Sequence, residues 1–141
     1  MILKNYELSK AVEILSAEDS IMNNIRIKLP HAFRHALRVN FKAIKDRNDI
    51  YKDEIQQIIT RYVDEGLATV KENGNVEFGA GHIDEVNTEL TELAVVDNDI
   101  AFETVPGDMI ERILETVDMS IPEENVIRLF AEVTNDNNST N

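Results

Sequence analysis

The chain has 141 residues, no cysteine, and 27 acidic against 14 basic side chains, which give a net charge of −13. This length fits one domain, and we expect residues 1–134 to form it, with residues 135–141 as a flexible polar tail. The lack of cysteine excludes disulfides, thiolate metal sites and cysteine nucleophiles, and the acidity disfavours attraction to nucleic acid or anionic membranes.

Apolar residues make up 43% of the chain, which is enough to bury a core, so we do not expect disorder. No apolar stretch reaches the length of a membrane span, and the first residues lack the apolar core of a signal peptide. The composition therefore predicts a cytoplasmic protein without a membrane partner.

The first predicted element is a short amphipathic helix over residues 6–17, with Asn5 as its cap. Its apolar positions recur at helical spacing, at Leu8, Ala11, Val12 and Leu15. Residues 21–29 alternate apolar and basic side chains from Ile25 to Leu29, which is strand-like, but the stretch is brief and ends against Pro30. We interpret them as a loop or an extended connector.

The strongest periodicity in the chain begins after Pro30 and continues to Gly66, where a left-handed helix end is expected. Apolar residues recur there at steps of three, four or seven, at Phe33, Leu37, Phe41, Ile44, Tyr51, Ile55, Ile58 and Tyr62. This pattern predicts a helix of about 35 residues. Either it folds back as a helical hairpin near residues 46–49, or it protrudes and pairs with another chain.

After Gly66 the apolar period changes from helical to alternating. Asn73-Gly74 between two short β-prone runs predicts a hairpin with a type I′ turn, in which both turn residues have a positive φ. A short helix over 83–93 and a third strand over 99–105 follow.

Two short helices are predicted to close the fold, and each begins with a capping-box pattern. The first pattern is Asp108 with Glu111, and the second is Ser120 with Glu123. The complete pattern predicts an α+β fold that is mostly helical, with a long helix or helical hairpin, a small antiparallel sheet and short C-terminal helices.

No residue pattern in the chain predicts a catalytic, metal or cofactor site. His31 and His35 lie four apart on one helix face, but a third ligand is not near them in sequence. Asp97-Asn98-Asp99 lacks the spacing of a cation-binding loop, and we interpret it as a solvated turn. We therefore expect a non-enzymatic protein without a small-molecule substrate.

Charge is distributed unevenly along the chain. Residues 1–70 have a net charge of +1, whereas residues 71–141 have 17 acidic and three basic side chains. The basic residues include one stripe on the long helix, formed by Arg34, Arg38, Lys42 and Lys45. The stripe is either a solvated face or a contact for the acidic half, within one chain or between chains.

The order of several segments along the chain is informative. They are Lys4-Asn-Tyr-Glu-Leu8, Arg26-Ile-Lys28, the helix from Phe33 to Tyr62, Asn73-Gly74-Asn75-Val76, residues 85–93 and residues 99–105. This order resembles a family of small proteins of tailed phages and prophages of Gram-positive bacteria, catalogued as a domain of unknown function. The chain departs from the family at Pro30-His31, which interrupts a basic run. The resemblance implies an accessory role in a phage and transfers no catalytic residue.

Two functions are favoured at this point, and a third, a small hydrolase whose site is assembled only in the fold, would need a deep pocket with convergent carboxylates or histidines. The first is a phage protein that acts by protein–protein contact, for example in virion assembly, and self-associates through the long helix. The second is an acidic inhibitor of a host defence or nucleic-acid enzyme, which could act as a DNA mimic, with Glu111, Glu115 and Asp118 on its contact surface. Both predict a location in the host cell cytoplasm, and the first also allows the virion.

Overall fold

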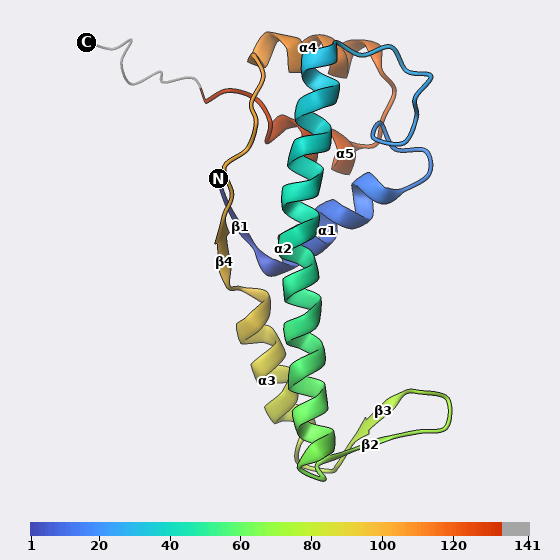
Figure 1. Cartoon of the computed structure of the whole chain (residues 1–141), viewed down its shortest axis with the longest axis vertical. Coiled ribbons are helices and arrows are strands. Elements are labelled where there is room, and N and C mark those ends of the chain that lie inside the picture. Colours follow the sequence, from blue (N-terminus) through green and yellow to red (C-terminus); the bar gives the residue numbers. More distant parts are fainter. Residues whose placement is uncertain (134–141) are drawn as a thin grey trace, which may run out of the picture. The chain divides into compact units, whose positions relative to one another are not determined.

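A computed structural model describes residues 1–133. Its helices and strands are, in chain order, β1 Ile2–Lys4, α1 Asn5–Ser16, α2 His31–Asp64, β2 Ala68–Val70, β3 Val76–Phe78, α3 Ile83–Ala94, β4 Asp97–Asp99, α4 Gly107–Thr116 and α5 Ile121–Arg128 (Figure 1). This is the mostly helical α+β class that the sequence predicts. The tail predicted over 135–141 lies outside the described residues.

The chain divides into two compact units. Unit 1 comprises Met1, Lys10–Ile44 and the chain from Ile100 onward, and unit 2 comprises Ile2–Ser9 and Lys45–Asp99. Helices α1 and α2 therefore contribute residues to both units.

Helix α2 is one continuous helix, so the helical-hairpin alternative is wrong (Figure 1). It ends where the sequence predicts, because Gly66 adopts a φ of 77°, a left-handed conformation that side chains with a Cβ disfavour. The N–H of Leu67 then bonds to the carbonyl of Tyr62 at 2.9 Å, which closes the helix end.

The core of unit 1 is formed by the apolar faces of its helices and by the irregular segments between them. Its fully buried side chains include Leu15, Ile21, Phe33, Leu37, Ile44, Ile110, Ile127 and Phe130. The ring of Phe130 packs edge-on against Phe102, with 5.3 Å between the ring centroids. Of the apolar stripe that predicted α2, Phe33, Leu37 and Ile44 are thus buried within unit 1.

The strand predicted over 99–105 is largely absent. Of that segment only Asp99 is in a strand, and Val105 forms an isolated parallel bridge with Ala131. A side chain replaces a strand partner here: Asn40, fully buried on α2, donates to the carbonyl of Glu103 and accepts from its N–H, both at 2.8 Å. The segment is therefore held in unit 1 without a sheet.

The capping box predicted at Asp108 is wrong. Helix α4 begins at Gly107, after Pro106 as its N-cap, and the cap has no side-chain hydrogen bond. Asp108 lies in the first turn instead, where its negative charge interacts favourably with the helix dipole.

The capping box predicted at Ser120 is half correct. The Ser120 hydroxyl accepts the N–H of Glu123, as predicted. The Glu123 carboxylate does not reach back to the cap, because it is buried and accepts the N–H of Ile21 at 2.9 Å. This bond ties α5, which ends at Arg128, to the connector after α1.

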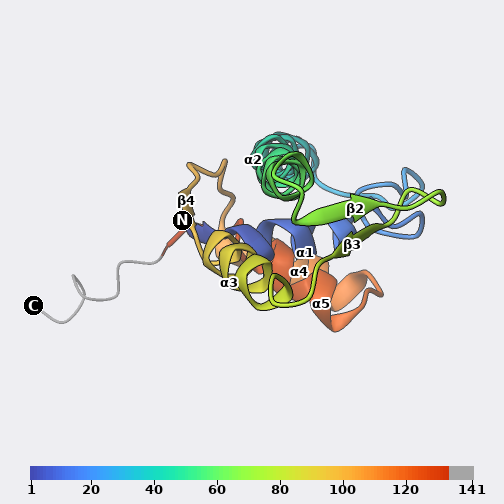
Figure 2. The same cartoon turned by 90° about the horizontal axis from the view of Figure 1, so that it is seen from below.

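Unit 2 has a smaller core, formed where the second half of α2 meets α3 and the β2–β3 hairpin. Tyr62, Ala68 and Val86 are buried, and the partly buried side chains packed against them are Ile58, Val63, Leu67, Val76, Phe78 and Leu90. Figure 2 shows β2 and β3 leaving the C-terminal end of α2 side by side.

The predicted hairpin is confirmed, with β2 and β3 antiparallel and Val70 opposite Val76. Its turn is not type I′, because Gly74 has a φ of 85° whereas Asn73 does not have a positive φ. The N–H of Lys71 bonds to the carbonyl of Asn75 and the N–H of Gly74 to the carbonyl of Lys71. These bonds define a three-residue loop with glycine in the left-handed position, which also matches the right-handed strand twist.

A second two-stranded sheet pairs β1 with β4, and it was not predicted from the sequence. Asp97-Asn98-Asp99 is therefore a strand and not the solvated turn we expected. The Asn98 amide donates to the carbonyl of Leu3 and to the side chain of Asn5, which satisfies the polar groups of this strand locally.

None of the helices in residues 1–133 combines the length with the apolar composition that a membrane span requires.

Candidate interaction face of helix α2

Helix α2 has one side in the protein core and an opposite side in solvent. The side that includes Phe33, Leu37 and Ile44 is buried. Successive residues of an α-helix are rotated by about 100°, so the opposite side is defined by position. It consists of His31, His35, Arg38, Val39, Lys42, Asp46, Asp49, Ile50, Asp53, Gln56, Gln57, Thr60 and Asp64, all exposed. We call this set the outer face.

Positive and negative charges are separated along the outer face. Its cations, Arg38 and Lys42, lie in the first half, and its four aspartates all come later in the helix. The first helical turn of α2 contains no acidic residue. A helix dipole favours acidic residues near the N-terminus and basic residues near the C-terminus, so this order is the reverse of the favourable one. Local helix stability does not explain the charge pattern.

Some charges beside or on this face are already paired. The ammonium of Lys45 contacts the carboxylate of Asp49 at 3.2 Å, and both side chains are about half exposed. Arg34 donates to the carbonyl of Ile27 at 2.7 Å, which fixes the connector. Of the predicted basic stripe, Arg34 and Lys45 thus have roles within the chain.

Arg38 and Asp53 differ from these residues. Both are exposed, and neither has a hydrogen bond or an ion pair with another residue in the range 1–133. They lie fifteen residues apart on the outer face, which corresponds to about 22 Å along the helix. Unpaired charges of opposite sign at the two ends of one face can bind the complementary ends of another.

Two apolar side chains interrupt this polar face. Val39 is 40% exposed and Ile50 is 55% exposed, although both belong to residue types that are most often buried. They lie eleven residues apart, close to three helical turns, so they occupy the same edge of the outer face.

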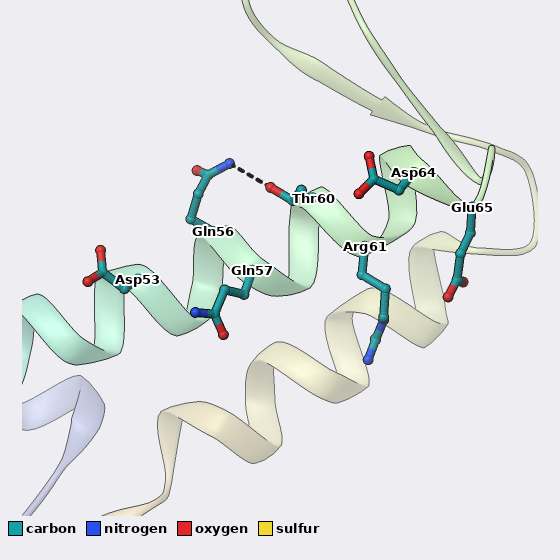
Figure 3. A pocket seen from close by; sticks show the side chains of 7 residues that line it. All are labelled: Asp53, Gln56, Gln57, Thr60, Arg61, Asp64 and Glu65. Atoms are coloured by element: carbon teal, nitrogen blue, oxygen red, sulfur yellow. Dashed lines mark hydrogen bonds between the residues drawn. The ribbon is translucent and has the colours of Figure 1, made fainter.

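The C-terminal part of the outer face borders an open hollow, shown in Figure 3, lined by Asp53, Gln56, Gln57, Thr60, Arg61, Asp64 and Glu65. The Gln56 amide donates to the Thr60 hydroxyl at 3.4 Å. Figure 3 shows Arg61 turned away from these side chains, toward α3. All seven residues that line the hollow have polar or charged side chains, so we do not interpret it as a small-molecule site.

Arg61 instead joins α2 to α3 inside unit 2. Its guanidinium donates to both carboxylate oxygens of Glu89 and lies over the Tyr62 ring, 5.4 Å from the centroid. Burial raises the pKa of the Tyr62 phenol above its usual 10, and the Glu89 carboxylate adds to the shift. The hydrogen bond to the Glu89 carboxylate, and then the charge of that carboxylate, also raise the pKa of Arg61.

The predicted acidic surface, Glu111, Glu115 and Asp118, is exposed at α4 and just after it. Glu111 accepts from Arg128 at 2.8 Å, so it is engaged within unit 1. Glu115 and Asp118 have no partner in the part of the chain that the structure describes. Among residues 1–133, Arg34, Arg38 and Lys45 of the basic stripe form no hydrogen bond or ion pair with these three carboxylates.

The histidines do not form a cluster with other ligands. His31 and His35 are exposed on the outer face, and His82 contacts Glu85 at 3.3 Å. Across residues 1–133, the structure contains no group of three or more histidine, aspartate or glutamate side chains that could hold a metal ion.

Comparison of the chain with protein-family models, with curated proteins and with solved structures finds no match. The geometry of the outer face is therefore the basis for a functional proposal. Sequence reasoning found its basic residues but missed Val39, Ile50 and Asp53. The available signal was the reversed charge order along the predicted helix.

Proposed function

We propose that this chain is a non-enzymatic accessory protein of a tailed phage or prophage, and that it acts by protein–protein contact and self-associates through the outer face of α2. The observation that supports self-association is the separation of opposite charges on one exposed face, in the order that the helix dipole disfavours, with Arg38 and Asp53 unpaired among residues 1–133. The phage setting rests on the resemblance in element order, and it implies the host cytoplasm or the virion as the location.

An antiparallel pairing of two α2 helices explains the charge order. If the two-fold axis passes between Lys45 and Asp46, Arg38 of each chain lies opposite Asp53 of the other, and Lys42 lies opposite Asp49. The basic half of each α2 helix then faces the acidic half of the other α2 helix, on both sides of the axis. A parallel pairing would instead bring Arg38 against Arg38, which is repulsive.

The same register uses the exposed apolar side chains. Val39 of one chain comes within one helical turn of Ile50 of the other, so each side chain can bury its exposed part against its counterpart. Burying a fully exposed valine or isoleucine side chain contributes about 1.5–3 kcal/mol. About half of each side chain is still exposed in one chain, so about half of this contribution remains for the dimer.

The proposed dimer is weak. The pairing places four ion pairs between the chains, and exposed pairs contribute about 0.2–1 kcal/mol each. The two pairs between Lys42 and Asp49 compete with the contact between Lys45 and Asp49 within each chain. Association itself costs at least about 4 kcal/mol. We therefore expect dissociation in the micromolar to millimolar range, weaker still at high salt because exposed charges are screened.

The test is sedimentation equilibrium of Arg38→Asp, Asp53→Arg and the double variant, compared with the wild type. Each single substitution makes two contacts repulsive and should weaken dimerisation by at least about tenfold. The double variant restores both contacts and should dimerise like the wild type. Arg47→Asp is the matched control, because Arg47 is exposed on the same helix but lies off the outer face.

A strictly monomeric wild-type protein up to millimolar concentration would contradict the proposal. A double variant as weak as the single ones would contradict the register.

A second candidate function is an acidic inhibitor of a host defence or nucleic-acid enzyme. Unit 2 contains 15 acidic and six basic residues, a net charge of −9, and Glu115 and Asp118 of unit 1 are exposed without partners among residues 1–133. Such a surface favours a basic partner.

This function predicts capture of a nuclease or DNA-binding protein from a lysate of a Gram-positive host. The capture should be lost in Glu115→Lys/Asp118→Lys, a variant that leaves the ion pair between Glu111 and Arg128 intact. Undiminished capture by this variant would exclude the role of these carboxylates.

A further inference from the structure

Unit 1 has a groove that is independent of the outer face of α2. The groove lies between the end of the connector and α4, with a volume of about 410 Å³. Its apolar lining comes from Leu29, Pro30, Met109 and Ile113, and Lys28 and Arg112 are its charged residues. A volume of this size lies near the lower end of the range for binding pockets and accommodates a few side chains.

The connector wall of this groove is held in place by three hydrogen bonds. The guanidinium of Arg34 donates a hydrogen bond to the carbonyl of Ile27 at 2.7 Å. The backbone N–H of Arg34 donates a second one to the carbonyl of Pro30 at 3.0 Å. The N–H of Ile21 donates to the buried carboxylate of Glu123 at 2.9 Å. The wall is thus anchored at both ends although it has no regular secondary structure.

Between these anchors the backbone has unused hydrogen-bonding groups. The N–H and carbonyl groups of Lys28 and Leu29 have no partner among residues 1–133. Unpaired backbone groups outside regular secondary structure can pair with an extended chain. They therefore favour a peptide that lies along the connector over a helix, whose backbone groups are already bonded.

The charges around the groove favour an acidic peptide. Residues 21–30 contain two cations, Arg26 and Lys28, and no acidic residue, although the whole chain is strongly acidic. On α4, Arg112 faces the groove together with Met109, whereas Glu111 lies about 100° around the helix from Arg112, on the side away from Met109. The contact between Arg112 and Asp108 is long, at 3.5 Å, and both side chains are largely exposed, so it leaves Arg112 available.

We propose that this groove docks an extended acidic segment of a partner protein that carries apolar side chains at alternate positions. The segment's backbone pairs with Lys28 and Leu29, and its apolar side chains fill the space between Leu29 and Met109. Its carboxylates contact Lys28 and Arg112.

The test uses a fluorescein-labelled peptide of alternating glutamate and leucine, titrated with the full chain and followed by fluorescence anisotropy. Lys28→Glu/Arg112→Glu should weaken binding by at least about tenfold, since two attractions become repulsions. Met109→Asp tests the apolar contact and should also weaken binding. Lys10→Glu is the control, because Lys10 is exposed in unit 1 and does not line the groove.

Amide shifts in the NMR spectrum locate the peptide and verify that each variant is folded. The expected shifts are confined to Lys28, Leu29 and the turn of α4 around Met109. Equal weakening by Lys10→Glu, shifts in unit 2, or equally strong binding of a lysine–leucine peptide would overturn the proposal. So would a wild-type protein that ignores the peptide but loses self-association in Lys28→Glu/Arg112→Glu, because the groove would then receive a second copy of this chain.

Discussion

The fully buried side chain of Asn40 offers the sharpest test of how unit 1 is held together. It joins α2 to residue 103 by two hydrogen bonds, as donor to the Glu103 carbonyl and as acceptor from the Glu103 N–H, both at 2.8 Å. Asn40→Asp preserves the shape and replaces the donor with a carboxylate oxygen. At neutral pH that oxygen faces the carbonyl, so the substitution removes one bond and buries a charge.

Losing a buried hydrogen-bond partner costs about 1–3 kcal/mol, and more when the group left behind is charged. We expect Asn40→Asp to lower the free energy of unfolding by about 3 kcal/mol near pH 7.5, or the melting temperature by roughly 10 °C. When the introduced carboxyl is protonated, it can donate to the Glu103 carbonyl as the asparagine amide does. Folding therefore raises the pKa of this carboxyl above about 3.9, its unfolded value.

A group whose pKa is raised on folding contributes stability below its unfolded pKa and loses it as the pH rises through the folded pKa. The difference between Asn40→Asp and the wild type should hence shrink as the pH falls from 7.5 toward 5. Urea denaturation followed by circular dichroism measures it, with Asn87→Asp on the exposed side of α3 as the control. A deficit under about 1 kcal/mol, or one that does not change with pH, would refute this reasoning.

Two further predictions concern unit 2. Gly66→Ala should lower the free energy of unfolding by about 1 kcal/mol, because the backbone φ of 77° at position 66 strains any residue with a Cβ, even though open space surrounds it. Thermal unfolding measures this loss, and an unchanged melting temperature would contradict the prediction. Because the pKa of Tyr62 is raised, its contribution is complete below about pH 10 and is lost as the pH rises through the folded pKa. Tyr62→Phe should flatten the fall in stability above pH 10, and an identical pH slope in urea titrations would contradict the burial argument.

The helices could be predicted from sequence because their signals are local. Apolar spacing located α1, α2 and α3, and Gly66 marked the end of α2. Whether α2 would fold back on itself was beyond this signal, since the polar residues 46–49 suit both a turn and the exposed side of a helix.

The strands β1 and β4 could not be predicted in the same way. Asp97-Asn98-Asp99 has low strand propensity. It forms a strand because β1, which is distant in sequence, pairs with it. The same reason applies to Asn40, whose two bonds to residue 103 replace the strand that alternation suggested over 99–105.

The candidate site was predicted in composition but not in detail. The basic stripe was visible as charges at helical spacing, but only burial shows which side of α2 faces solvent. Arg34 then anchors the connector that forms one wall of a groove, whereas Arg38 belongs to the outer face with Asp53. Exposure of Val39 and Ile50 likewise depends on the packing of the opposite side.

The most direct test of self-association through α2 is a mixing experiment with the two single variants. Arg38→Asp has only acidic side chains at positions 38 and 53, and Asp53→Arg has only basic ones, so each should be impaired as a homodimer. In the antiparallel pair, a mixture matches acid with base at both contacts. Sedimentation equilibrium should therefore show a heterodimer at least as stable as the wild-type dimer, whereas a mixture that stays as monomeric as its two components would contradict the proposal.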